Sequence, residues 1–148
     1  MNVGGLFRIA DALGVEHLYL AGASARPPNA KLRRASRSTE KWVPHSWTAD
    51  GVALARELKG SGCLLVSLEL TSSSTDIREL SWDGEQPLCL IVGSENTGVA
   101  QALLDLSDHT LHIPMLGHNS SMNVATACGI AVFELTRGLV PSAVGGPG

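Results

Sequence analysis

Three polar segments carry the side chains whose types and spacing are suited to chemistry. Residues 93–98 follow the most apolar stretch of the chain and place Glu95 between two glycines. Residues 117–123 form a second polar turn, and Asn2 lies six residues before Arg8 in an otherwise apolar segment. Ligands of open α/β sheets bind just beyond the carboxyl ends of strands, where a carboxylate can orient or polarise them. Glu95 is equally suited to cap a following helix, and the residue types leave both interpretations open.

Several common catalytic patterns are absent from the sequence. Residues 93–98 have the outer glycines of a phosphate-binding loop, but Val99 and Ala100 follow where that loop needs lysine and serine or threonine. Neither G-x-G-x-x-G nor G-x-S-x-G occurs. The five histidines form no tight ligand set, so we expect surface or satisfied histidines and no metal. The three cysteines lack a C-x-x-C motif, which favours a reducing, cytoplasmic location.

Positive charge is concentrated in one window of an otherwise acidic chain. Residues 26–41 hold six basic residues against the single acid Glu40, a net charge of +5 in a chain whose total is −3. Such a patch is suited to the phosphates of a nucleic acid, although a solvated loop and helix face has the same composition. The candidate phosphate-binding residues are Arg26, Lys31, Arg33, Arg34, Arg37 and Lys41.

The elements that must position these segments alternate between helix and strand. Apolar spacing of three and four residues predicts helices, and short apolar runs ended by glycine or polar residues predict strands. Runs that are apolar on both faces are typical of a parallel sheet. We therefore expect an α/β domain over residues 1–140, with a mainly parallel sheet and helices on both faces, and a flexible tail over 141–148. The expected helices are 5–13, 49–59, 99–106 and about 121–137, and the expected strands are 17–21, 63–68, 88–92 and 110–113.

The expected last helix is apolar on nearly every side, with Ser121 as its expected N-cap. A helix of this kind must be buried all round, either inside one core or between the sheet and a second subunit. The pattern favours a homodimer. No apolar run reaches 18 residues and no signal peptide is evident, so we expect no membrane partner.

Taken in order, these segments resemble the three motifs of the SpoU (TrmH-like) branch of the SPOUT methyltransferases. The first motif covers residues 2–14, the second 90–98, and the third 113–117 followed by 121–125. Their order and spacing match over about residues 2–137, and residues 40–44 are also similar to this branch. Members of the family transfer a methyl group from S-adenosylmethionine to a ribose 2′-hydroxyl of tRNA or rRNA, and the resemblance implies that activity here.

The resemblance also implies a fold and a cofactor pocket. The family has a deep C-terminal trefoil knot, an exception to the rule that chains are unknotted. The knotted loops hold S-adenosylmethionine, and members dimerise through the first and last helices. By position, the residues implied to line the pocket are Leu68, Gly93, Ile113, Met115, Ser121 and Met122.

For the reaction, the resemblance implies that Arg8 is the key catalytic residue. Arg8 would either stabilise the developing alkoxide or engage the adjacent RNA phosphate, because an arginine stays protonated and is a poor base. The basic window would hold the RNA backbone. The residues implied to orient Arg8, the ribose and the cofactor are Asn2, Glu95, Ser121 and Asn123.

Some features depart from the family pattern. Family chains carry a strand before the first-motif asparagine, which here is Asn2, so we expect a chain that lacks its first strand. Met122 stands where leucine is usual, and Ala125 where serine is common. One alternative is a catalytically inert, dimeric RNA-binding module of the same fold. Another is an enzyme that methylates a base nitrogen, against which the pair of Asn2 and Arg8 argues.

Overall fold

The computed structural model describes residues 3–22, 39–94, 96–118 and 122–139. Helices and strands are interspersed along them, as the sequence predicts. The strands are β1 (Leu18–Ala21), β2 (His45–Thr48), β3 (Leu64–Leu68), β4 (Thr75–Asp76), β5 (Leu88–Ile91) and β6 (His109–His112). The helices are α1 (Val3–Leu13), α3 (Gly51–Gly60), α4 (Gln101–Leu106) and α5 (Val124–Leu135), with single 3₁₀ turns η1 (Thr39–Lys41) and η2 (Ile77–Glu79).

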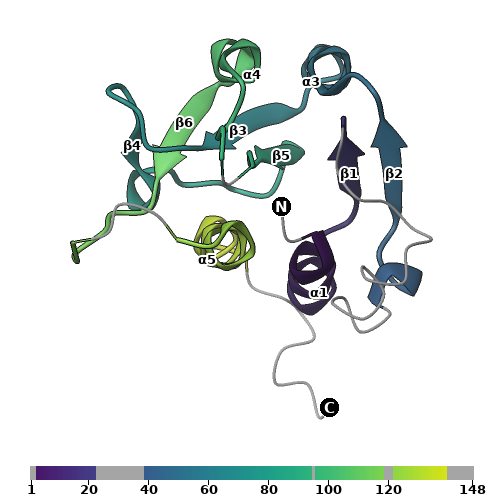
Figure 1. Cartoon of the computed structure of the whole chain (residues 1–148), viewed down its shortest axis with the longest axis horizontal. Helices are drawn as coiled ribbons and strands as arrows, with labels where there is room; N and C mark the ends of the chain where they lie inside the picture. The colour runs from purple at the N-terminus through teal and green to yellow at the C-terminus, as the bar shows by residue number, and fades with distance from the viewer. Residues whose placement is uncertain (1–2, 23–38, 95, 119–121, 140–148) are drawn as a thin grey trace.

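Every strand pair in the described residues is parallel, but the strands form two sheets. The larger sheet has the order β4-β6-β3-β5, and the smaller one pairs β1 with β2. The α/β class is therefore confirmed. Within the described residues the parallel pairing falls into these two sheets, since no strand of the larger sheet pairs with β1 or β2 (Figure 1).

Strand β3 is the centre of the larger sheet because it pairs with β5 on one side and β6 on the other. Successive side chains of β3 point to opposite faces of the sheet and pack in two different layers. Val66 packs with Leu111 of β6 and with Ala131 and Leu135 of α5. On the opposite face, the buried Ser67 hydroxyl is 2.6 Å from that of Ser107, which ends α4. Figure 1 shows α3 and α4 over one face of the sheets and α5 and α1 below the other, so helices cover both faces.

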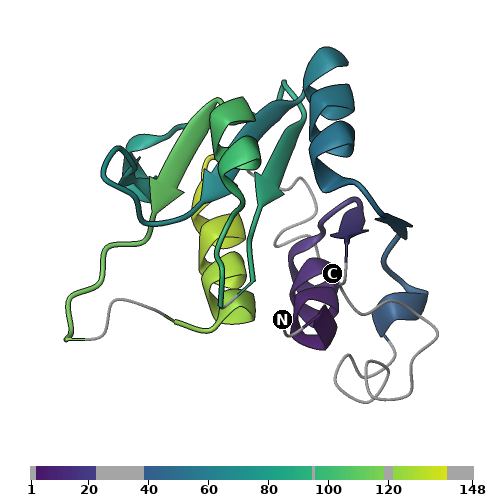
Figure 2. The ribbon, with the colours of Figure 1, turned by 45° about the horizontal axis from the view of Figure 1, so that its top comes forward.

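A second, smaller core lies beneath β1 and β2. Val3, Phe7 and Ala10 project from one face of α1 and pack against Leu20 of β1 and Val43. The positions 3, 7 and 10 fall on one stripe of a helix, which is why this segment buries one side only. The two cores meet where α1 packs beside α5, as both ribbon views show (Figure 2).

Side chains cap the N-termini of two helices, and one of these caps corrects an expectation. Helix α3 begins after Asp50, whose carboxylate accepts from the amide of Ala53 at 3.0 Å. Helix α5 begins at Val124 and not near residue 121, because the side chain of Asn123 accepts from the amides of Ala125 and Thr126. Asn123, and not Ser121, is therefore the N-cap of α5.

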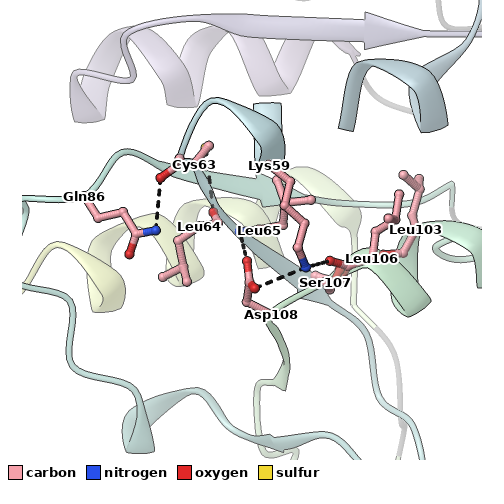
Figure 3. A network of polar contacts seen from close by, with 11 residues as sticks. Lys59, Cys63, Leu64, Leu65, Gln86, Leu103, Leu106, Ser107 and Asp108 are labelled. Atoms are coloured by element: carbon pink, nitrogen blue, oxygen red, sulfur yellow. Dashed lines mark hydrogen bonds and ion pairs between the residues drawn. The ribbon is translucent and has the colours of Figure 1, made fainter. Parts of the chain in front are cut away.

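A polar network on the α3 and α4 side ties the larger sheet to its helices (Figure 3). The Asp108 carboxylate accepts from the amide of Leu65 at 2.8 Å and lies 3.2 Å from the Lys59 ammonium group. The same Nζ donates to the carbonyl oxygen of Leu106 at 2.6 Å. One carboxylate thus connects α3, β3 and the segment that leads into β6.

Replacing Asp108 with alanine should destabilise the domain, because the amide of Leu65 and the Lys59 ammonium group both lose a partner. A buried donor left without an acceptor costs about 1–3 kcal/mol, and we expect a loss of that order in the free energy of unfolding. Urea denaturation measures it. Glu57→Ala, which removes an exposed carboxylate from α3, is the control; equal unfolding midpoints for the two variants would contradict the role given to Asp108.

The cysteines are free thiols within the described residues. Burial raises the pKa of Cys89 to about 11, by desolvation and then by the neighbouring Cys63. Burial alone raises the pKa of Cys128 to about 11. Burial, followed by the Asp108 carboxylate, also raises the pKa of Cys63. The thiolate is the reactive form, so these thiols are protonated and unreactive near neutral pH.

Alkylation tests this state of the thiols. At pH 8 a pKa of about 11 lowers the thiolate fraction about a hundredfold relative to an ordinary thiol. We expect iodoacetamide to label Cys89 and Cys128 in the native protein about a hundredfold more slowly than in the urea-unfolded chain. Peptide mass spectrometry over a time course measures both rates, and similar rates in the two states would refute the expectation.

Candidate functional site

A cavity of about 370 Å³ lies where the carboxyl ends of β3, β5 and β6 meet the start of α5. Parallel pairing of these strands brings their three following loops to one edge of the sheet. Its described lining consists of Leu68, Glu69, Leu70, Val92, Gly93, Ser94, Asn96, Thr97, Gly98, His112, Ile113, Met115, Met122, Val124 and Ala127.

The turn after β5 has a shape that depends on its glycines. The amide of Gly98 donates to the carbonyl oxygen of Ser94 at 2.8 Å, and Gly98 adopts φ +67°. A Cβ atom at Gly93 would lie 2.1 Å from the carbonyl carbon of Gly98, so the two ends of the turn touch only when position 93 is glycine. The amide of Thr97 donates to the Ser94 hydroxyl at 3.1 Å. The described residues of this turn that line the cavity are Gly93, Ser94, Asn96, Thr97 and Gly98.

Two titratable residues absent from the predicted site line this cavity. The carboxylate of Glu69 accepts from the amide of Val99 at 3.1 Å, and the Glu69 amide donates to the carbonyl oxygen of Leu111 at 2.9 Å. Nδ1 of His112 is 2.9 Å from the hydroxyl of Ser74, so this histidine has a partner, as expected of the histidines in general. Their position in the sequence could have identified both residues, because each stands at the carboxyl end of a strand that belongs to the same parallel sheet.

Five of the six residues implied to bind a cofactor are brought together by the fold. Leu68, Gly93, Ile113, Met115 and Met122 all line the cavity, although they come from four separate segments of the chain. The sixth, Ser121, lies outside the described residues, as do Asn2 and Glu95. The role of these residues stays a prediction, while their convergence on one hollow is a property of the structure.

A second, wider hollow of about 940 Å³, called the groove below, runs between α1 and α5. Arg8, which is exposed, and Asn123 both line it. The helices approach closely here: a Cβ at Gly129 would lie 3.2 Å from Cδ1 of Ile9. The first turn of α5 separates the two hollows, since Val124 and Ala127 line the cavity whereas Asn123, Ala125 and Thr126 line the groove.

Large apolar side chains surround this groove. Phe133 is 69% exposed, Ile130 41% and Leu13 37%. The apolar last helix is therefore not buried on every side within one chain, which argues against the alternative of burial inside a single core. The remaining exposed face is available to a second subunit.

Most of the basic window lies outside the described residues. Arg26, Lys31, Arg33, Arg34 and Arg37 belong to that part of the chain. Lys41 is exposed at the end of η1, which packs against α1, the helix that carries Arg8. No group of three or more potential metal ligands occurs in the described residues, and none of their helices is long and apolar enough to cross a membrane.

Comparison with known proteins shows which family has this arrangement. A model of the SpoU rRNA Methylase family matches residues 1–133, which include all three motif segments and every strand of the described residues. The chain belongs to the SpoU methylase family. The resemblance that the motifs indicate is therefore confirmed over nearly the whole chain.

Relatives and solved structures of this family agree with the match. The tRNA (guanosine(18)-2′-O)-methyltransferase of Escherichia coli (strain K12) is 32% identical over 139 residues, which is 92% of this chain and 58% of the relative. The SpoU methyltransferase AviRb from Streptomyces viridochromogenes, solved in complex with AdoMet, has a TM-score of 0.78 at 31% identity, covering 92% of this chain and 55% of that one.

A third comparison extends the structural match. The AdoMet-bound rRNA methyltransferase from Sinorhizobium meliloti has a TM-score of 0.86 at 28% identity, covering 95% of this chain and 52% of that chain. The chain spans about half the length of these relatives. Its fold is that of the solved SpoU methyltransferases, and the trefoil knot implied by the resemblance stays a prediction.

Proposed function

We propose that this chain transfers a methyl group from S-adenosylmethionine to a ribose 2′-hydroxyl of tRNA or rRNA. The observation that carries the proposal is the convergence of the second and third motif segments on one cavity at the carboxyl ends of β3, β5 and β6. Support comes from the E. coli relative, named a tRNA (guanosine(18)-2′-O)-methyltransferase, and from AviRb, solved with AdoMet. These relatives are named as methyltransferases, which favours an active enzyme over the inert RNA-binding module.

The cavity suits the proposed cofactor in size and lining. About 370 Å³ lies within the usual range for small-molecule sites. Leu68, Ile113, Met115 and Met122 supply apolar surface for a flat heterocycle such as adenine, and the turn at 93–98 supplies backbone donors and acceptors beside it. This combination of an apolar wall and a few fixed polar groups is typical of nucleoside-like ligands.

Residues of this chain would position the reacting hydroxyl and stabilise the negative charge that develops on its oxygen. S-adenosylmethionine, when bound, supplies a methyl group on a sulfonium, which an oxygen nucleophile displaces in line. Exposed Arg8 lines the groove on the other side of the first turn of α5 from the cavity. A guanidinium stays protonated, so Arg8 would stabilise negative charge on the ribose oxygen or hold the adjacent phosphate, and would not remove the proton. Asn2, Glu95, Ser121 and Asn123 would orient these groups.

The assembly and location form part of the same proposal. We place the reaction in the cytoplasm, since free thiols suit a reducing compartment. We propose a homodimer that covers the exposed apolar side chains of α1 and α5, including Phe133 and Ile130. Residues 1–140 would form the methyltransferase domain, with 141–148 as a tail.

The proposed activity is tested by cofactor binding followed by methyl transfer. Calorimetric titration should show saturable binding of S-adenosylmethionine and S-adenosylhomocysteine, near one per chain. Labelled methyl groups should then move from S-adenosylmethionine to unmodified tRNA or rRNA, with the label on a ribose after nuclease digestion. Label found on a base, or cofactor binding without transfer to any RNA, would reject the proposed reaction.

Arg8→Ala should remove most of the activity and leave the cofactor site intact. Loss of one group that stabilises developing charge lowers turnover about 10²–10³-fold. The cavity lining does not include Arg8, so we expect S-adenosylmethionine affinity to change by less than about threefold. Single-turnover assays and calorimetry measure the two effects. Arg56→Ala, an exposed arginine on α3, controls for loss of charge, and equal loss of activity in both variants would argue against a special role of Arg8.

The basic window should contribute to RNA affinity and not to cofactor affinity. Replacing Arg33, Arg34 and Arg37 with alanine removes three positive charges, which should flatten the salt dependence of RNA binding by about two units of slope on a logarithmic plot. S-adenosylmethionine binding should be unchanged. Filter binding at several salt concentrations tests this, with Arg56→Ala/Arg137→Ala as a control for charge loss elsewhere. Unchanged RNA affinity in the triple variant would eliminate this surface as the RNA contact.

A further inference from the structure

We propose that Glu69 is a positioning residue of the cofactor site and that its charge favours the sulfonium cofactor over the neutral thioether product. The inference rests on the proposed function, since it concerns the same cavity. Glu69 belongs to none of the three motif segments, and it follows β3 directly. The evidence for its role is the set of contacts that Glu69 makes and the negative charge that it adds to the cavity lining.

The contacts of Glu69 join three strand ends. Its amide donates to the carbonyl oxygen of Leu111 in β6 at 2.9 Å, which fixes its backbone at the edge of the sheet. From that point its carboxylate reaches across to accept from the amide of Val99 at 3.1 Å, just after the turn that follows β5. One residue therefore joins the loop after β3 to the loop after β5, and both loops contribute to the cavity lining.

The carboxylate packs directly on the turn. Gly98 has φ +67°, and a Cβ there would lie 2.7 Å from Oε2 and 3.0 Å from Oε1 of Glu69. Glycine at position 98 thus provides both the backbone conformation and the space for the carboxylate. The hydrogen bond to Val99 holds this turn in the form that lines the cavity.

The charge of Glu69 is distinctive within the cavity. Among the described lining residues it is the one with a formal negative charge, and His112 is the other titratable side chain. S-adenosylmethionine carries a sulfonium and an ammonium group, whereas S-adenosylhomocysteine lacks the sulfonium charge. A ligand that fills about 370 Å³ places its sulfur within a few ångströms of the walls, where a carboxylate attracts a cation more strongly than in water. Product would then leave more readily than substrate.

Two substitutions separate the two roles. Glu69→Gln keeps an oxygen that can accept from Val99 but removes the charge, so S-adenosylmethionine affinity should fall about tenfold while S-adenosylhomocysteine affinity stays within about twofold. Glu69→Ala removes both, so both ligands should bind more weakly. Glu57→Gln on α3 is the control for charge loss at a distance. Calorimetric titration of the wild type and of the three variants with both ligands gives, for each protein, the ratio of the two affinities.

Hydrogen exchange of the ligand-free protein tests the positioning role independently. The Val99 amide should exchange faster in Glu69→Ala than in the wild type, and at the wild-type rate in Glu69→Gln. Unchanged exchange in Glu69→Ala overturns the positioning role, whether or not a cofactor binds. If the wild type binds S-adenosylmethionine and Glu69→Gln keeps the wild-type ratio of the two affinities, the charge role is overturned and the proposed function stands. A wild type that binds neither ligand overturns the proposed function and the charge role together.

Discussion

Parallel pairing of β3 with both β5 and β6 is the constraint on which the site depends. Val66 is paired with Leu90 on one side and with His109 on the other, so the three strands end at the same edge. Every described residue that lines the cavity belongs to the last position of one of these strands, to the loop that follows it, or to the start of α5. The Asp108 carboxylate fixes this arrangement at the opposite end, where it binds the amide of Leu65 as β3 begins.

The start of α5 divides the site into two compartments with different chemistry. On one side it closes an apolar and backbone-rich cavity, which suits a nucleoside-like cofactor. On the other it borders a groove in which the exposed Arg8 lies beside exposed apolar side chains of α1 and α5. Asn123 stands at the boundary and caps the helix through its side chain. The cap therefore fixes the first turn of α5, which separates the cavity from the groove. Asn123, which is predicted to orient the reactants, has this structural role as well.

Much of this organisation is predictable from the sequence, for identifiable reasons. The apolar runs of β3 and β5 and the polar residues that follow them predict strands that end in loops. The family resemblance implies one site for Leu68, Gly93, Ile113, Met115 and Met122, and these residues line one cavity. The cap of α5 is less predictable, since Ser121 and Asn123 are both good caps and only the course of the backbone chooses between them.

Other features depend on contacts that join distant segments. The two-residue β4 has no periodicity to detect, and it exists because it pairs with β6. Glu69 looks like an ordinary exposed acid after a strand until the turn at Gly98 is seen to pack against it. The division into two sheets is likewise a matter of tertiary pairing, since β1 and β5 are both good strands by composition. Local patterns specify elements well, but they do not specify partners.

The division into two cores has a consequence for the dynamics of the domain. Phe7 and Leu20 belong to the small core beneath β1 and β2, whereas Val66 and Leu111 belong to the large core beside the cavity. Groups of residues with separate cores can open as separate cooperative units, and the smaller one opens at lower free energy. Arg8 is carried by α1, which belongs to the small unit. Under the proposed function, a local opening of that unit would withdraw the Arg8 guanidinium while the cavity stays formed, so RNA engagement and cofactor retention would depend on different parts of the chain.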